Sequence, residues 1–344
     1  MVRPFDIRDM SAVQRLSVHG CALAHEIAAI DGVNPMLNAI RAAVQTSVPF
    51  PSISDRHVIL THRDDGQHAD SFGIMEIGSV SGNSQVAPAV MTYLAPLPET
   101  EKLKDAWIDL LDAFAGMAAA VEARFMVAEV PETGRVADAF LTSGFVPILH
   151  QDILKLPVVS SRGTRKRPAE QDLGHSQVPG LRLQTDKDDL YLKLLAARVI
   201  PKLATLHMAN MDPTRLMHQT RVGFMLMHAQ EACGHVSVNK GRKGSALRML
   251  IRHDVPEIQP HLAEMLETIL VEAGIPTSQP IYCMLPSYLS WMLPILDGLG
   301  FVHHAATTVM LKHITASVRV PVWQTQRNPL GVRLANYDAS IRLT

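Results

Sequence analysis

Cysteine is scarce in this chain, and its scarcity excludes two common structural frameworks. Only three cysteines occur among the 344 residues, Cys21, Cys233 and Cys283, and no two of them have CxxC spacing. Cysteines so few and so far apart predict neither a disulfide framework nor a zinc site. They suit a reducing compartment, so we expect a cytoplasmic protein.

Excess charge and long apolar runs are also missing. The formal net charge is -1, so the chain as a whole has no electrostatic attraction for nucleic acid or for an anionic membrane. No run approaches the ~20 apolar residues that a membrane helix needs. The first nine residues include Arg3, Asp6, Arg8 and Asp9 and lack the apolar core of a signal peptide. We therefore expect no membrane and no nucleic acid as a partner.

Histidine, in contrast, is abundant, but the histidines lack the spacing of metal ligands. None of the sixteen falls at i, i+4 beside a carboxylate on an expected helix. His303 and His304 are adjacent and would point to opposite faces of a strand. We expect solvated or core histidines and no metal site.

The length of the chain fits two domains, and the sequence contains two copies of one plan. A chain of 344 residues is long enough for two domains of roughly 150 residues each. The openings "VRPFDIRDMSAVQRL" and "LRLQTDKDDLYLKLL" both predict a short strand, a capping aspartate and a helix. Both copies close with a strand, a helix, a glycine-phenylalanine pair and an expected hairpin, the pairs being Gly144-Phe145 and Gly300-Phe301.

Between these ends, each copy has three expected strands followed by one long amphipathic helix. The expected elements are strands 56–63, 71–80 and 86–95 with helix 104–123, and strands 222–230, 233–239 and 246–254 with helix 260–274. We place the domains at 1–157 and 181–315, the linker at 158–180 and a C-terminal tail at 316–344. The linker carries four basic residues, for which we expect solvent exposure, with contact to an anionic partner as the alternative: Arg162, Arg165, Lys166 and Arg167.

This order of elements resembles the GNAT superfamily of acyl-CoA N-acyltransferases. The resemblance covers almost the whole chain and is carried by the two "GF" pairs, the "VRPFDIRD" opening and the strand-loop-helix in the middle of each copy. It implies an α/β (α+β) fold of two tandem GNAT-like domains in contact, each a mixed, mostly antiparallel sheet flanked by helices. It also implies acetyl-CoA as the cofactor and a small-molecule or peptide amine as the acceptor.

The chain departs from the family at the positions that carry the chemistry. The family holds the pyrophosphate of coenzyme A with a Q/R-x-x-G-x-G/A loop directly before the long helix, where backbone N–H groups point at the anion. The loops here are "LPETEKLKD" at 97–105 and "HDVPEIQPHL" at 253–262, both acidic and without glycine. The tyrosine that many members use as a general acid is replaced by Phe140 and Leu296.

In the family, the cofactor lies in a gap between the fourth and fifth strands. We expect other residues near the mouth of this gap to take the place of the missing tyrosine and of the missing glycine loop. A glutamate or histidine there can take a proton from an amine, and the alternative is that these are polar residues at strand ends. The candidate catalytic residues are Glu129, Tyr93, His253 and Tyr288. The candidate cofactor-binding residues are Leu94, Ala95, Lys102, Lys104 and His261.

Two functions remain open from the sequence. One is an acyl-CoA-dependent N-acetyltransferase that acts by general-base catalysis and has atypical cofactor loops. The other is a catalytically silent GNAT-like module that binds a ligand or a protein. The oligomeric state stays open as well.

The basic stretch "NKGRKGSALRML" at 239–250 resembles a phosphate loop but lies one strand too early for that role. We interpret Gly241 and Gly244 as turn residues that supply the φ values of a hairpin. Lys240, Arg242 and Lys243 then form a solvated basic tip, with contact to an anionic partner as the alternative.

Overall fold

The computed structural model describes residues 1–32, 56–63, 69–77, 89–132, 134–158, 180–202 and 221–314, together with positions 35 and 204. The predicted tail at 316–344 lies outside the described residues, and so does the predicted linker apart from its two end residues. The four basic linker residues Arg162, Arg165, Lys166 and Arg167 also lie outside them.

The first half follows the predicted order of elements. Its strands are β1 Val2–Pro4, β2 Cys21–Ala22, β3 Arg56–His62, β4 Ser71–Ile77, β5 Ala89–Ala95, β6 Phe125–Pro131 and β7 Val146–Leu156. Its helices are α1 Met10–Leu16, α2 His25–Ile30, α4 Glu101–Ala120 and α5 Gly134–Thr142. The long helix α4 begins where the Thr100 side chain accepts a hydrogen bond from Leu103 N, and it buries Trp107, Leu110 and Phe114 against the sheet.

The second half repeats this order. Its strands are β8 Leu181–Leu183, β9 Arg221–His228, β10 Glu231–Lys240, β11 Ser245–Ile251, β12 Ile281–Pro286 and β13 Val302–His313. Its helices are α6 Asp189–Val199, α8 Leu262–Glu272 and α9 Leu293–Gly298, with the 3-10 helices η4 Pro256–His261 and η5 Ser287–Met292 leading into α8 and α9.

One ion pair occurs at the same place in both halves. Arg3 on β1 binds Asp9 at 2.6 Å, and Arg182 on β8 binds Asp188 at 2.6 Å. Each aspartate is 2% exposed and completes a capping box at the turn that leads into the first helix. The duplication in the sequence is therefore also a duplication of local structure.

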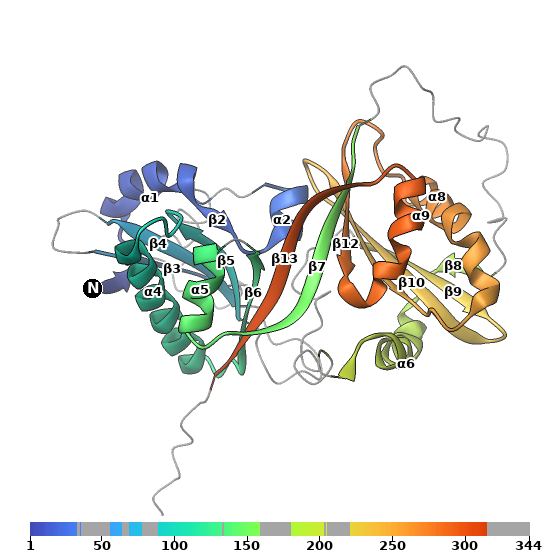
Figure 1. The fold of residues 1–344 in the computed structure, drawn as a ribbon, viewed down its shortest axis with the longest axis horizontal. Helices are drawn as coiled ribbons and strands as arrows, with labels where there is room; N and C mark the ends of the chain where they lie inside the picture. The colour runs from blue at the N-terminus through green and yellow to red at the C-terminus, as the bar shows by residue number, and fades with distance from the viewer. Residues whose placement is uncertain are drawn as a thin grey trace, which may run out of the picture.

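The described strands form a single mixed sheet in which the two halves exchange their last strands. The order is β1-β3-β4-β5-β6-β13-β7-β12-β11-β10-β9-β8, with β2 added beside β5. Strand β13 of the second half pairs with β6 of the first, and β7 of the first half pairs with β12 of the second. Figure 1 shows β7 and β13 running side by side between the halves.

The predicted closing hairpins are therefore wrong. After Gly144 and Gly300, which end their helices at φ 81 and φ 86, the chain continues as one long strand and does not turn back. The reason is that β6 and β12 offer unpaired backbone edges, and pairing with the other half's last strand satisfies them. The predicted domain boundaries stay a prediction, because the two halves share this central pair of strands.

Helices from both halves cover the sheet. Helices α4 and α5 pack on one face of the first half, and α8 and α9 pack on the second half (Figure 1). Helix α2 belongs to the first half but packs against strands of the second, with Ile30 against Ala246, Tyr282 and Met284. The expected contact between the halves is thus made by a helix as well as by strands.

Candidate active site

The parallel strands β11 and β12 separate part of the way along their length. They pair from Ser245 with Ile281 to Arg248 with Met284, and no further. Within the described residues, no backbone hydrogen bond spans the space between residues 249–251 and the end of β12. Backbone groups along a strand need a hydrogen-bond partner, and between residues 249–251 and the end of β12 no described backbone group supplies one.

The equivalent gap of the first half is filled by the chain itself. Strands β5 and β6 pair only at Ala89 with Met126 and Val90 with Val127. Beyond these pairs, β2 lies along β5, and Leu23 bridges the two strands. Leu23 N donates to Thr92 O at 2.9 Å, and Leu23 O accepts from Glu129 N at 2.8 Å. The Leu23 side chain is fully buried, so the chain itself occupies this part of the gap.

The candidate residues of the first half lie around this filled gap. Burial raises the pKa of Tyr93 to about 12, and its hydroxyl donates to Ser17 O at 2.6 Å. Leu94 and Ala95 are buried, and the backbone of Leu94 pairs with Cys21 of β2. Lys104 lies 3.8 Å from Glu101, and Lys102 is exposed on the same turn of α4. Nothing in the structure tests the roles of these five residues, which stay predictions.

In the second half, Tyr288 lies near the point where β11 and β12 separate. It is the second residue after β12 and is half-buried. Burial raises the pKa of Tyr288 to about 12, although the positive charge of Arg248 opposes the shift. The phenol is therefore protonated at neutral pH.

The loop before α8 contains the candidate His253 and two acidic residues. His253 is exposed, and its carbonyl oxygen accepts from Gln259 Nε2 at 3.0 Å. Asp254 binds Arg252 at 2.9 Å, which lowers the pKa of Asp254 to about 2. Part of the negative charge of this loop is thus already neutralised from within the protein.

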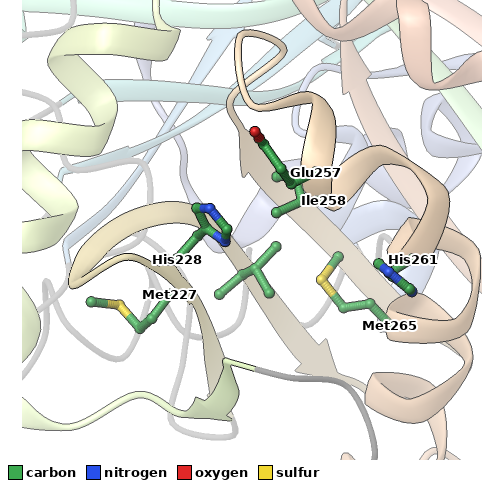
Figure 2. Close-up of a pocket in the computed structure, with 7 residues that line it drawn as sticks. Met227, His228, Glu257, Ile258, His261 and Met265 are labelled. Atoms are coloured by element: carbon green, nitrogen blue, oxygen red, sulfur yellow. The ribbon is translucent and has the colours of Figure 1, made fainter.

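His261, at the start of α8, lines a pocket of about 210 Å³. Figure 2 shows the pocket between the end of β9, which carries His228, and the segment from η4 to α8, which carries Glu257 and His261. Strand β10 separates β9 from β11, so this pocket and the gap between β11 and β12 are different sites. The position of His261 in this pocket therefore does not support its predicted role at the gap between β11 and β12.

A cluster of charged residues from both halves lies beside the gap of the second half. Glu26 on α2 is 2% exposed and is bound by the Arg248 guanidinium and by Asn239 Nδ2, the latter at 3.2 Å. Arg248 also lies 3.6 Å from Glu129 Oε1, and Glu129 Oε2 accepts from the backbone N–H of His25 at 2.6 Å.

Sequence reasoning selected Glu129 from this cluster but missed Glu26, His25 and Arg248. A signal for Glu26 is present, because a carboxylate stands in the otherwise apolar helix of "CALAHEIAAI". A buried charge of this kind needs a partner elsewhere in the structure. The partner, Arg248, is more than two hundred residues away in sequence and gives no local signal.

The Arg242 and Lys243 side chains at the tip of the β10–β11 hairpin are exposed, as predicted, while the backbone of the tip caps helix α2. Lys243 N and Gly244 N donate to Ile30 O at 2.6 and 3.1 Å, and Arg242 N donates to Asp31 Oδ1 at 2.9 Å. Gly241 and Gly244 lie in the turn of this hairpin, as predicted, but neither has a positive φ, so they are not there for their φ values. A Cβ added at Gly241 would instead lie 2.5 Å from Ile30 O. The anionic partner of this stretch is the C-terminal end of α2.

No family model matches the sequence, and no curated protein matches it. The structure is similar to a tandem GNAT protein from the clavulanic acid biosynthesis pathway, with 15% identity, a TM-score of 0.47, and 92% of this chain and 99% of that chain covered. It is also similar to a GCN5-related N-acetyltransferase from Sphaerobacter thermophilus, with 10% identity, a TM-score of 0.46, and 91% and 95% covered. An acetyltransferase of the GNAT family from Colwellia psychrerythraea is similar at 11% identity and a TM-score of 0.40, with 91% and 99% covered.

At these identities and TM-scores the similarities carry no conclusion about the reaction. The predicted fold class is confirmed in its architecture: the protein is α/β, with a large mixed sheet flanked by helices and one order of elements repeated in the two halves. No helix in the part of the chain that the structure describes is long and apolar enough to cross a membrane. Among the same residues, no group of three or more His, Cys, Asp or Glu is placed to hold a metal ion.

Proposed function

We propose that this protein is an acyl-CoA-dependent N-acyltransferase that moves an acetyl group from acetyl-CoA to an amine in the gap between β11 and β12. The observation that carries the proposal is the difference between the two gaps. Leu23 joins β5 to β6 in the first half, whereas no described segment joins β11 to β12 beyond Arg248 and Met284. In this proposal the first half does not bind acetyl-CoA, and the second half holds the single site for it.

The residues at this gap suit the reaction. Acetyl-CoA is the donor substrate, and its extended arm carries amides that can pair with the free edges of residues 249–251. Because the thioester is already activated, the protein has to orient the amine and manage two protons. Tyr288 is protonated at neutral pH, and we assign it the role of proton donor to the departing thiolate.

The loop before α8 fits the pyrophosphate less well. It has no glycine, and Glu257 adds negative charge near the start of α8. The pairing of Asp254 with Arg252 and the positive end of the α8 dipole reduce this repulsion. We therefore expect weaker binding of acetyl-CoA than a glycine-rich loop gives.

Calorimetry with acetyl-CoA tests the proposal. We expect one acetyl-CoA bound per chain, because only one of the two gaps is free. Ser287→Trp places a bulky side chain directly after β12 and should abolish binding, and Ser290→Trp, on the same exposed turn, is the matched control. Absence of binding at millimolar acetyl-CoA, or equal binding by both variants, would refute the proposed site.

A catalytically silent binding module is the second candidate. The observation in its favour is that Phe140 and Leu296, where the resemblance expects a proton-donating tyrosine, are both fully buried apolar side chains. Such a module would bind acetyl-CoA or another ligand without releasing free coenzyme A. Thiol release from acetyl-CoA therefore separates the two candidates.

A further inference from the structure

His25 has an unusual combination of contacts at the first position of α2. Its Nδ1 is buried, has no hydrogen-bond partner among the described residues, and lies 3.8 Å from Glu129 Oε2. The same carboxylate oxygen accepts the backbone N–H of His25 at 2.6 Å, which fixes the start of the helix relative to Glu129. No hydrogen bond from a described residue engages Nε2, and that nitrogen is not among the buried unpaired atoms.

The pair formed by His25 and Glu129 lies at the apex of the gap in the second half. Glu129 Oε1 is 3.6 Å from Arg248, and Arg248 is the last residue of β11 that pairs with β12. Helix α2 packs against both of these strands. His25, the first residue of α2, is therefore on the side of these two strands that α2 covers.

We propose that His25 is the general base of the acyl transfer and that Glu129 is its positioning residue. The inference rests on the proposed function. His25 Nε2 removes a proton from the acceptor amine as the amine nitrogen bonds to the thioester carbonyl carbon. The carbon–sulfur bond then breaks, coenzyme A leaves with a proton from Tyr288, and the product is the N-acetyl amine. The proton on His25 passes to solvent and Tyr288 is reprotonated, so no other reactant is needed.

The electrostatic surroundings keep His25 in the form that a base requires. Burial lowers the pKa of His25, and the nearby His304 on β13 lowers it further, whereas Glu129 on β6 raises it. The other charges around it, Glu26 on α2 and Arg248 on β11, are paired with one another. With a pKa below the ordinary value of about 6.5, the imidazole is neutral at pH 7.

Glu129 itself is a poorer candidate for the base. Both of its carboxylate oxygens are engaged, one by the His25 N–H and one by the Arg248 guanidinium. Its orientation toward Nδ1 instead resembles the general arrangement in which a carboxylate orients an imidazole. We therefore assign it to holding His25 in place.

The test compares His25→Gln with His19→Gln in the full chain; His19 is an exposed histidine of the same half. Thiol release from acetyl-CoA is followed with spermine as the amine probe and with water alone, and acetyl-CoA binding is measured by calorimetry. For His25→Gln we expect unchanged binding, kcat lowered by about 10²–10⁴-fold, and loss of the acid limb of the kcat profile. His19→Gln should match the parent chain.

The Glu129→Gln variant tests whether Glu129 acts on the pKa of His25, an effect that a purely structural role of Glu129 would not produce. Removing the carboxylate charge lowers the pKa of His25, so the acid limb of kcat should move to lower pH. A parent chain that does not bind acetyl-CoA refutes the proposed function itself. A chain that binds acetyl-CoA but releases no thiol with either probe also refutes the acyl transfer and favours the silent binding module. A His25→Gln variant that keeps the parent rate and acid limb overturns the assignment of His25 alone.

Discussion

Arg248 Nη2 of the second half and Glu129 Oε1 of the first half lie 3.6 Å apart, although three strands stand between β11 and β6 in the sheet. In a flat sheet, four spacings of about 4.8 Å would place the two backbones roughly 19 Å apart. The contact therefore requires a curved sheet whose concave face holds α2. The cluster that results joins both halves to one candidate site.

The buried pair of Glu26 and Arg248 is expected to make a large contribution to stability. Arg248→Met leaves Glu26, which is 2% exposed, without its cationic partner, and we expect a loss of about 3–5 kcal/mol in the free energy of unfolding. The exposed Arg242→Met is the control and should cost less than about 0.5 kcal/mol. Urea unfolding measures both, and the double variant Glu26→Gln, Arg248→Met should recover part of the loss. A single-variant loss no greater than that of the control would contradict this role.

Gly241 is expected to be required for the close contact between the hairpin and α2. Gly241→Ala places a Cβ 2.5 Å from Ile30 O, and we expect destabilisation by about 1–3 kcal/mol. Gly116→Ala, on the exposed face of α4 with nothing within 4 Å, is the control and should stabilise the protein by up to about 1 kcal/mol. Thermal unfolding of the two variants should therefore move in opposite directions. Equal shifts would show that the tip does not need the close approach.

The exchanged strands predict which half responds when the C-terminal strand is removed. A chain that ends at residue 301 loses β13, and the edge of β6 in the first half loses its partner. Hydrogen exchange should then show loss of protection in β6 at Met126, Ala128 and Val130, whose N–H groups face β13. A chain that ends at residue 314 keeps β13 and is the control. Protection of β6 in the shorter chain equal to that in the control would contradict the exchange.

The ion pair of Arg182 and Asp188 predicts a dependence of stability on pH. The pair, together with hydrogen bonds from Thr185, holds the pKa of Asp188 far below its ordinary value. The native state therefore favours the ionised form, and the stabilisation is present above the unfolded pKa of about 3.9 and is lost as the pH falls through the native pKa. We expect Asp188→Asn to cost about 3 kcal/mol at pH 7 and progressively less below pH about 4. A cost that is independent of pH down to acid unfolding would refute this cause.

Local sequence patterns predicted the elements of each half well. The strands before and after α4 and α8, and the helices themselves, follow from apolar periodicity and from caps such as Thr100. These signals act within one turn of a helix or one strand, so they are readable without tertiary structure. The strand ends that carry Glu129 and Tyr288 were located for the same reason.

The contacts that define the candidate site could not be predicted in this way. Leu23 fills the first gap, Glu26 meets Arg248, and His25 meets Glu129, all between segments that are remote in sequence. Nothing in the residues next to Arg248 indicates a partner on α2. The same holds for Gly241, which has to be small because the Ile30 carbonyl oxygen of the other half lies close to it.

The sequence by itself determined the class of fold, the duplication and the order of elements, because hydrophobic periodicity and capping act locally. Only the tertiary structure decided that β7 and β13 change places, that one gap is closed by the chain while the other stays free of described segments, and that α2 of the first half carries residues to the second. The physical reason is that strand edges pair with whichever free edge the completed sheet presents, and buried charges pair across the interface that this pairing creates.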